Sequence, residues 1–469
     1  MIDRPPPGRL VPAADGTALA GEDVREPAPL DGQPSRRECL LGLAALPLGR
    51  FSPAEPPGLV VRPQAFGARP DGQSDSTRAI QQAIDAAGPW GGQVRIEGGT
   101  FCITDRLAIA WPGVTLAGDG TIKAAENFDR TPRQPMIEVT APGVRIECLA
   151  LDQDHRMVQG ESIRGVGAKG LRIRNVTSRN TQRAFVVLGD RCTDVEIAGC
   201  DHFGRGWGVL APDSRGVARI VVRGCRFEHP GDGSVGDAVE LNCPSHGARQ
   251  VWLADLRAQG YVGEARNAGM GFGFARVRDT MLLRCRAEDC EGDGFHWENG
   301  SDDALVLQCA ARRIGRPDPV GGNGSGFIAY DSDRWIGHDL EARECWYHGI
   351  ALSGQGSRTQ NSGGRMLDCL VLGAGRDGLH LTAQRDFEVS RCLVRDPSKS
   401  VPSRYAGIRV GRQGRTSLEN LWGRGSGNRV ELTGATRPLD AVAIRPESLG
   451  VEIGATVRFG IGAGFALPS

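Results

Sequence analysis

The sequence predicts an all-β protein, a right-handed parallel β-helix (a solenoid of about 24-residue coils) with a short N-terminal capping helix. Three observations predict this fold. Gly-led apolar runs and cysteines recur every 23–25 residues through the middle of the chain. Each interval holds two short runs of alternating apolar and polar residues, a pattern typical of strands. The 67 glycines are about twice the usual ~7%, as many tight corners would require.

The composition limits the classes of partner. The formal net charge is zero, with 40% hydrophobic and 24% charged residues, which is enough for a large core. Because the charge is balanced, there is no overall electrostatic footprint for nucleic acid. No run of 18 apolar residues occurs, so we expect no membrane partner for the mature form.

The N-terminal region divides into two segments. Residues 1–34 are rich in Pro, Gly and charge, and we expect a disordered extension. Residues 35–55 begin with SRRECLLGLAALPLG, an arginine pair before a short apolar stretch. This segment resembles a twin-arginine export signal and implies a periplasmic or extracellular protein. The alternative is a chance arginine pair before an apolar loop.

The next segment, residues 60–125, is expected to form an N-terminal cap and the first coils. In residues 75–87, DSTRAIQQAIDAA, Asp75 is predicted to N-cap a helix that Gly88-Pro89 terminates. The helix would place Ala79, Ile80, Ala83, Ile84 and Ala87 on one stripe. It would cover the open sheet edge at the end of the solenoid.

The main β-helix is predicted over residues 126–425, with terminal coils or a cap over 426–469. Its Gly-led strands are RAFVVLG (183–189), RGWGVLAP (205–212), GDAVELN (236–242), GMGFGFA (269–275), GDGFHWEN (292–299), SGFIAYD (325–331), HGIALSG (348–354), DGLHLTA (377–383) and AGIRVG (406–411). The thirteen cysteines include no C-x-x-C pair, so we predict buried apolar residues and no zinc ligation.

Residues 64–104, QAFGARPDGQSDSTRAIQQAIDAAGPWGGQVRIEGGTFCIT, carry a family resemblance. They contain F-G-A, then D-G, then D-x-T-x-A-I-Q-x-A-I, then a Gly-rich strand ending G-x-[FY]. This pattern resembles the first segment of the pectate-lyase-like β-helix enzymes, which include rhamnogalacturonases, polygalacturonases and epimerase-like proteins. The resemblance implies the fold over roughly residues 60–425 and a polysaccharide substrate. The same fold also hosts lyases and non-catalytic binders.

Aligning the Gly-led strands brings most ionisable side chains of the central coils into one outward stripe. Its members are Asp237, Glu240, Asp293, His296, Glu298, Tyr330, His348, Asp377 and His380. An ordinary solvated face, the alternative interpretation, would scatter Ser, Thr, Lys and Glu along its length. The stripe therefore predicts a functional surface. In the run 183–189, the same alignment places Val186 and Leu188 outward.

Acid–base cleavage of a sugar linkage needs two carboxylates, one protonated and one ionised. We expect this pair to come from four acids, with two histidines assisting: Asp237, Glu240, Asp293 and Glu298, with His296 and His348. The alignment puts Glu240 and Glu298 in one column two coils apart, roughly 9.6 Å by strand spacing. Inverting glycosidases separate their carboxyls by roughly 6.5–9.5 Å. The expected substrate-binding residues are Asn242, Tyr330, Asp377, His380 and Arg205.

This chain carries only part of the set of motifs that the family's hydrolases share. YHGIALSGQGS (347–357) resembles their His-Gly segment and places His348 at its histidine. The N-T-D motif is absent, and Arg409 has no lysine two residues later. A hydrolase of a uronate-containing or related polysaccharide is thus the leading prediction, without the family's full acid assignment. We expect no cofactor and no metal for it.

Two alternatives remain open. A lyase or epimerase would need a base, such as His296, His348 or Tyr330, and a cation to neutralise the uronate carboxylate. Calcium is the cofactor expected in that case, with candidate ligands Asp302, Asp303, Asp331 and Asp333; corner residues without a metal are the simpler interpretation of these acids. The second alternative is a non-catalytic carbohydrate-binding or structural β-helix.

Overall fold

The structure is a computed structural model in which Pro57–Ser469 form one compact unit. It describes residues 58–128, 134–154, 160–231, 236–263, 269–317, 324–354, 361–385, 387–401, 405–412, 416–419, 421–424, 430–433, 442–444 and 449–451. The predicted extension at 1–34 and export signal at 35–55 lie outside these residues. So does most of the predicted terminal segment 426–469.

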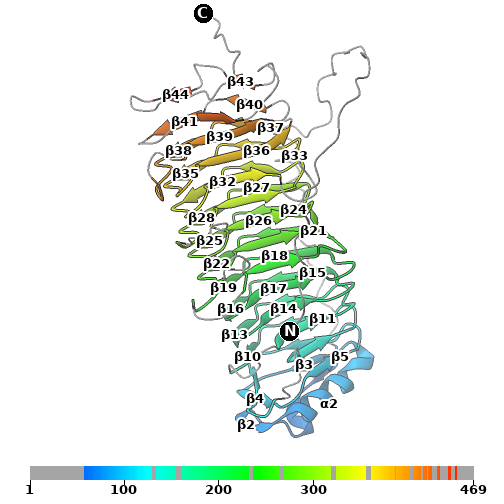
Figure 1. The fold of residues 1–469 in the computed structure, drawn as a ribbon. Helices are drawn as coiled ribbons and strands as arrows, with labels where there is room; N and C mark the ends of the chain where they lie inside the picture. Colours follow the sequence, from blue (N-terminus) through cyan, green and yellow to red (C-terminus); the bar gives the residue numbers. More distant parts are fainter. Residues whose placement is uncertain are drawn as a thin grey trace, which may run out of the picture. The chain divides into compact units, whose positions relative to one another are not determined.

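The unit is an all-β parallel solenoid, as predicted, and its coils follow one another in chain order along the stack (Figure 1). Among the residues that the structure describes, two sheets have 15 strands each and a third has 14. The coils average about 27 residues, longer than the predicted 24. Register partners lie 23 residues apart at Met366 and Val389 but 31 apart at Val222 and Leu253. Insertions at the corners account for the difference.

All nine Gly-led runs enter the third sheet, here called the site sheet. Its strands are β5 (Leu107–Ile109), β8 (Ile137–Val139), β11 (Glu161–Gly165), β14 (Ala184–Leu188), β17 (Trp207–Pro212), β20 (Val239–Asn242), β23 (Phe272–Ala275), β26 (Phe295–Glu298), β29 (Phe327–Tyr330), β32 (Ile350–Ser353), β36 (Leu379–Arg385), β39 (Ile408–Arg412) and β42 (Val430–Thr433). The short β33 (Asn361–Ser362) pairs with β36 off this path. All these pairings are parallel.

A helix lies against the first coils, as predicted. The helix α2 (Thr77–Ala87) buries the predicted apolar stripe and contacts β1 (Val60–Val61), β3 (Gln93–Arg95) and β5. Its N-cap residue is Ser76, so the assignment of Asp75 as the N-cap was wrong by one residue. Asp75 is the residue before the N-cap, and its carboxylate still accepts a hydrogen bond from the Thr77 N–H in the first turn, at 2.9 Å.

The interior of the solenoid is a stack of apolar rungs. The Phe295 ring lies 4.9 Å from Phe272 and 4.6 Å from Phe327, centroid to centroid, on three successive coils. Trp297 is fully buried and stacks on Phe274 at 5.4 Å. Offset aromatic pairs of this kind add to the free energy gained by burial. The outward residues between these rungs are therefore held on a rigid support.

A column of glycines explains the repeated Asp-Gly and His-Gly pairs at the strand starts. A Cβ on Gly294 would lie 2.6 Å from the Gly326 carbonyl oxygen and 2.9 Å from Ala311 Cβ. Gly326 and Gly349 are crowded in the same way by the following coil. Any side chain at these glycines would clash with the next coil, so the strand starts can pack this closely only with glycine. The residue before each glycine, such as Asp293 or His348, therefore stands at a fixed corner.

The cysteines behave as predicted apolar residues. Among the described residues, every cysteine except Cys148 is buried, and all carry free thiols. Within the same described part of the chain, no helix is long and apolar enough to cross a membrane.

Candidate functional site

Three members of the predicted stripe, Glu240, His296 and His380, lie in one column of the site sheet. From coil to coil the register partners are Glu240, Gly273, His296, Ile328, Ala351, His380 and Arg409. Glu298 belongs to the next column, where its register partner is Ala275 and that of Ala275 is Asn242. The prediction that Glu240 and Glu298 share one column was therefore wrong: they are offset by two residues as well as by two coils.

The first polar group on this surface joins Asp237 to Glu240. Asp237 is 1% exposed, and its Oδ1 accepts the Met270 N–H at 2.6 Å. Burial and the neighbouring Glu240 charge raise the pKa of Asp237 well above its usual range. Glu240 is half-buried, and its carboxylate accepts hydrogen bonds from Trp207 Nε1 and, at 2.9 Å, from Asn242 Nδ2. Asp237 therefore keeps its proton to a higher pH than an exposed aspartic acid does.

The second group is a histidine between two carboxylates, two coils farther along. Asp293 Oδ2 lies 2.8 Å from His296 Nδ1, and Glu298 Oε2 lies 3.5 Å from His296 Nε2. Burial alone would lower the pKa of His296, but Asp293 and Glu298 raise it to about 10. The His296 imidazole beside it in turn lowers the pKa of Glu298. At neutral pH this group is an imidazolium with an ionised, 41% exposed Glu298 side chain.

Asp293 is held in place from the following coil. Its Oδ1 accepts the N–H groups of Gly324 and Ser325 at 2.8 and 2.7 Å. It is fully buried, so its carboxylate orients His296 and does not reach solvent. Simple strand alternation points Asp293 inward, but the corner at Gly294 turns its carboxylate toward the outer column.

Tyr330 lies on the coil after His296. Its ring centroid is 5.6 Å from that of His296. Burial, followed by the charge of Asp293, raises the pKa of the Tyr330 phenol. The phenol therefore stays protonated at neutral pH and is available as a hydrogen-bond donor beside the imidazolium.

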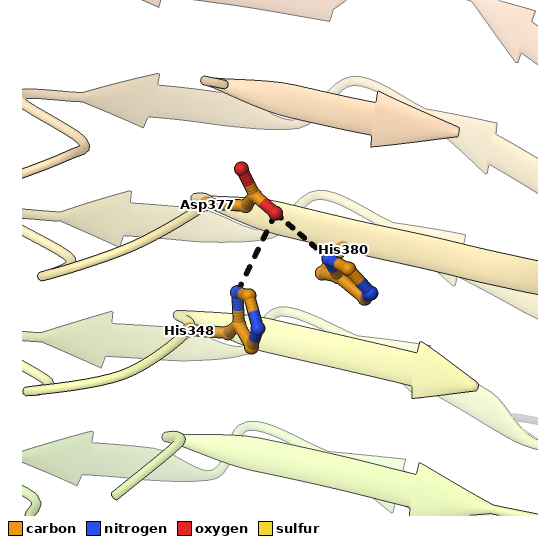
Figure 2. A group of neighbouring side chains, drawn as sticks. All are labelled: His348, Asp377 and His380. Atoms are coloured by element: carbon orange, nitrogen blue, oxygen red, sulfur yellow. Dashed lines mark hydrogen bonds and ion pairs between the residues drawn. The ribbon is translucent and has the colours of Figure 1, made fainter. Parts of the chain in front are cut away.

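The third group lies three register steps beyond His296, about 14 Å at the usual strand spacing. Asp377 Oδ2 lies 2.7 Å from His380 Nδ1 and 2.9 Å from Arg409 Nε (Figure 2 shows the first of these contacts). His348 is 7% exposed, and its Nδ1 lies 3.7 Å from the same oxygen. Burial, followed by the charge of His380, lowers the pKa of His348 to about 3. His348 is therefore a neutral imidazole at physiological pH.

Asp377 repeats the arrangement of Asp293. Its Oδ1 accepts the Ala406 N–H at 2.7 Å, and the residue three positions later is again the histidine it contacts. Burial alone would raise the pKa of Asp377, but the hydrogen bonds of His380, Ala406 and Arg409 hold it at about 2. The sequence pattern Asp-x-x-His thus produces an oriented imidazole on two separate coils.

Several predicted positions differ from the structure. Val186 and Leu188 face the core, because Val186 pairs with Val209 in the inner column. Arg205 lies before the start of β17 and donates to Gln182 Oε1 at 3.4 Å, while Trp207 occupies the position next to Glu240. The error at Val186 and Leu188 arises where the spacing of register partners changes, from 23 residues at Val186 and Val209 to 30 at Val209 and Val239.

The acids named as calcium ligands have other partners. Asp303 makes a two-point ion pair with Arg334, Asp302 accepts the Asp333 N–H, and Asp333 accepts the Ser362 N–H. These contacts support the interpretation as corner residues. Two residues near the candidate site were missed as members of it, Trp207 and Arg409. The alignment placed Arg409 in the His380 column, which was a usable signal; Trp207 carried none.

The chain is similar to known proteins at two levels. Residues 61–140 match the family model described as rhamnogalacturonase A/epimerase, pectate lyase-like. The match covers the cap and first coils, where the resemblance was seen, and none of the candidate site residues. No curated protein matches this chain in sequence.

Among solved structures, gene product 12 of bacteriophage phi29 aligns with 13% identity and a TM-score of 0.53, covering 79% of this chain and 54% of that one. A family 28 exopolygalacturonase of Yersinia enterocolitica aligns with 12% identity and a TM-score of 0.50, covering 85% and 78%. The ORF18 protein of Geobacillus virus E2 aligns with 15% identity and a TM-score of 0.48, and this chain spans 61% of its length. At these identities the first two similarities establish the fold and not the reaction.

Proposed function

We propose that the protein is a polysaccharide-active enzyme, with glycoside hydrolysis of a uronate-containing or related polymer as its reaction. One arrangement supports the proposal: the buried Asp237 and the more exposed Glu298 lie two coils apart on the site sheet, and their pKa values are shifted in opposite directions. The pKa of Asp237 is raised and that of Glu298 is lowered. Hydrolysis of a glycosidic bond needs this asymmetry, because one group donates a proton while the other activates water.

The roles follow from exposure. Asp237 is buried, so its proton would reach the leaving oxygen through the half-buried Glu240. Glu298 is ionised and exposed, and would take the proton of the attacking water. Two coils separate the strands by about 10 Å, and the offset of two residues adds about 7 Å along them. The two backbone positions are thus about 12 Å apart, beyond the roughly 6.5–9.5 Å between the carboxyls of inverting enzymes, so Glu240 would have to leave Trp207 and turn toward Glu298 when substrate binds.

The arrangement of His296 supports the same assignment. An imidazolium between Asp293 and Glu298 supplies a fixed positive charge. That charge lowers the pKa of Glu298 and so keeps it available as a base. His348 and His380 lie farther along the stack, where they would contact neighbouring sugar units together with Tyr330.

A lyase or epimerase is the second candidate, and the neutral His348 favours it. Proton abstraction next to a uronate carboxyl needs an unprotonated base and a nearby cation. His348 is neutral at physiological pH, and Arg409 bonds the same Asp377 that faces it. In this reaction the third polar group, and not the Glu298 group, would be the catalytic centre.

The distinguishing experiment is a panel of uronate-containing and neutral polysaccharides incubated with wild type, Glu298→Gln and His348→Gln. New reducing ends without ultraviolet-absorbing unsaturated uronate, lost in Glu298→Gln, would support the hydrolase. Formation of unsaturated product by wild type, and its loss in His348→Gln, would support the lyase. Inversion of the uronate C5 configuration without chain cleavage would support the epimerase. Binding without product would support a carbohydrate-binding module instead. Glu388→Gln, which alters a surface ion pair with Arg365, is the control.

We also propose export of the protein, on the strength of the arginine pair at residues 36–37. Replacing both arginines by lysine should retain the full-length chain in the cytoplasm, since twin-arginine signals depend on that pair. Cell fractionation of the two chains tests this. Equal amounts of both chains outside the cytoplasm would contradict it.

A further inference from the structure

Three side chains on two adjacent coils turn their ligand atoms toward one another at the third polar group. His348 precedes β32, and Asp377 and His380 belong to the next coil of the site sheet (Figure 2). One nitrogen or oxygen of each lies within 4.8 Å of the others. We propose that His348, Asp377 and His380 form a binding site for a divalent transition metal, with zinc as the best-fitting ion.

The first support is an unsatisfied atom. Within the described part of the chain, His348 Nδ1 is buried and has no hydrogen-bond partner. Asp377 Oδ2 faces it at 3.7 Å, which is too long for a hydrogen bond. An unpaired buried nitrogen costs free energy unless something binds it. Two metal–ligand bonds of roughly 2.0–2.2 Å, meeting at an open angle, would span this gap.

The second support is the chemistry of the donors. Imidazole binds transition metals through a ring nitrogen, and each of the two histidines offers one within 4.8 Å of the other ligand atoms. Two imidazoles and one carboxylate suit zinc, iron, cobalt or nickel, whereas calcium and magnesium prefer oxygen ligands alone. Asp377 is fixed by the Ala406 N–H, so one ligand is already oriented. The proposal departs from the sequence-based expectation of no metal, or of calcium.

Arg409 opposes metal binding and sets its strength. Its Nε lies 2.9 Å from Asp377 Oδ2, and His380 Nδ1 lies 2.7 Å from the same oxygen. A metal would replace the proton on His380 and weaken the bond from Arg409. The guanidinium also repels a second positive charge at this distance. Removing the Arg409 charge should therefore tighten metal binding.

The test uses the full-length protein, treated with a chelator, dialysed and titrated with Co²⁺ and then Zn²⁺. We expect one equivalent of Co²⁺, a visible d–d absorption band, its loss on adding Zn²⁺, and a raised melting temperature. The band should come without the near-ultraviolet charge transfer of cobalt–thiolate bonds, because the free cysteines are not ligands. No substrate is involved, so this result is separate from the proposed hydrolysis.

Variants identify the ligands. His348→Gln and His380→Gln should each reduce Co²⁺ affinity by about 100-fold, near two tenfold steps, and Arg409→Met should increase it by about tenfold or more. His338→Gln is the control, since His338 pairs with Asp368 on another sheet. Full binding by both glutamine variants would overturn the assignment. Absence of stoichiometric binding by folded wild type and folded Arg409→Met would overturn the site itself.

Discussion

The carboxylate of Asp293 lies 2.8 Å from His296 Nδ1 and fixes that ring from behind. Its other oxygen accepts two backbone N–H groups from a loop that follows some thirty residues later in the chain. One side chain therefore joins the corner of the next coil to an imidazole on the outer surface. Because Nδ1 is engaged, Nε2 is directed toward Glu298. The orientation of the candidate site thus depends on the stacking of the coils.

Asp293→Asn should uncouple His296 from its support. The buried negative charge is what raises the pKa of His296 to about 10, against the effect of burial. Without it we expect that pKa to fall by several units, and turnover of the active polysaccharide to fall at least about 100-fold. NMR titration of labelled His296 measures the first effect, and steady-state kinetics the second. Asp368→Asn, beside the surface His338, is the control; an unchanged His296 titration in Asp293→Asn would contradict the positioning role.

Glu298→Gln should remove the proposed base while keeping the side-chain shape. General acid–base groups contribute about 10²- to 10⁴-fold to rates, so we expect kcat to fall by that amount with KM little changed. The matched control Glu388→Gln should retain wild-type kinetics, because Glu388 pairs with Arg365 at a surface position on another sheet. If Glu298→Gln keeps full kcat while Glu240→Gln loses it, the base has been assigned to the wrong residue.

Much of the site was predictable because side chains in a strand alternate and coils stack in register. His296, Ile328, Ala351 and His380 form the column that alignment of the Gly-led runs predicts. The errors lie where this regularity breaks. Val186 was placed on the wrong face because the coils before β20 have different lengths, and a shift of one residue exchanges the two faces of a strand.

Corner residues could not be oriented from the sequence. Asp293 and Asp377 stand just before a strand, where alternation no longer applies. Their direction is set by N–H groups of Ser325 and Ala406 on the following coil, which alternation within the strand does not reveal. The hydrogen bond from Trp207 to Glu240 likewise depends on the register of β17, which the alignment misplaced. The alternation within each strand predicts which residues share a column. The direction of a side chain at a corner is instead set by contacts with the next coil.

Acid should destabilise the protein partly through His348. Its folded pKa is about 3, whereas an unfolded imidazole titrates near ~6.5. Between these values the unfolded chain binds more protons than the folded one, so the free energy of unfolding falls as pH decreases through this window. His348→Gln should lose less stability than wild type between pH ~6.5 and ~4, measured by urea unfolding with a chelator present.

His338→Gln is the comparison variant. It removes a half-buried imidazole that pairs with Asp368 outside the candidate site and leaves His348 in place, so it should keep the decline of the wild type. If His348→Gln and wild type lose the same free energy on acidification, the folded protein does not keep His348 neutral.

Gly294→Ala should damage the fold and the site together. The new Cβ would lie 2.6 Å from the Gly326 carbonyl oxygen and 2.9 Å from Ala311 Cβ. Such overpacking costs typically about 1–3 kcal/mol, and relief requires the corner that carries Asp293 to move. Gly273→Ala is the matched control on the preceding coil: its nearest neighbours would be Met270 Sδ at 3.6 Å and Glu240 Cγ at 3.8 Å, ordinary contacts. Thermal unfolding should therefore separate the two variants by several degrees, and equal melting temperatures would mean that the coils are not packed as closely as the glycine column requires.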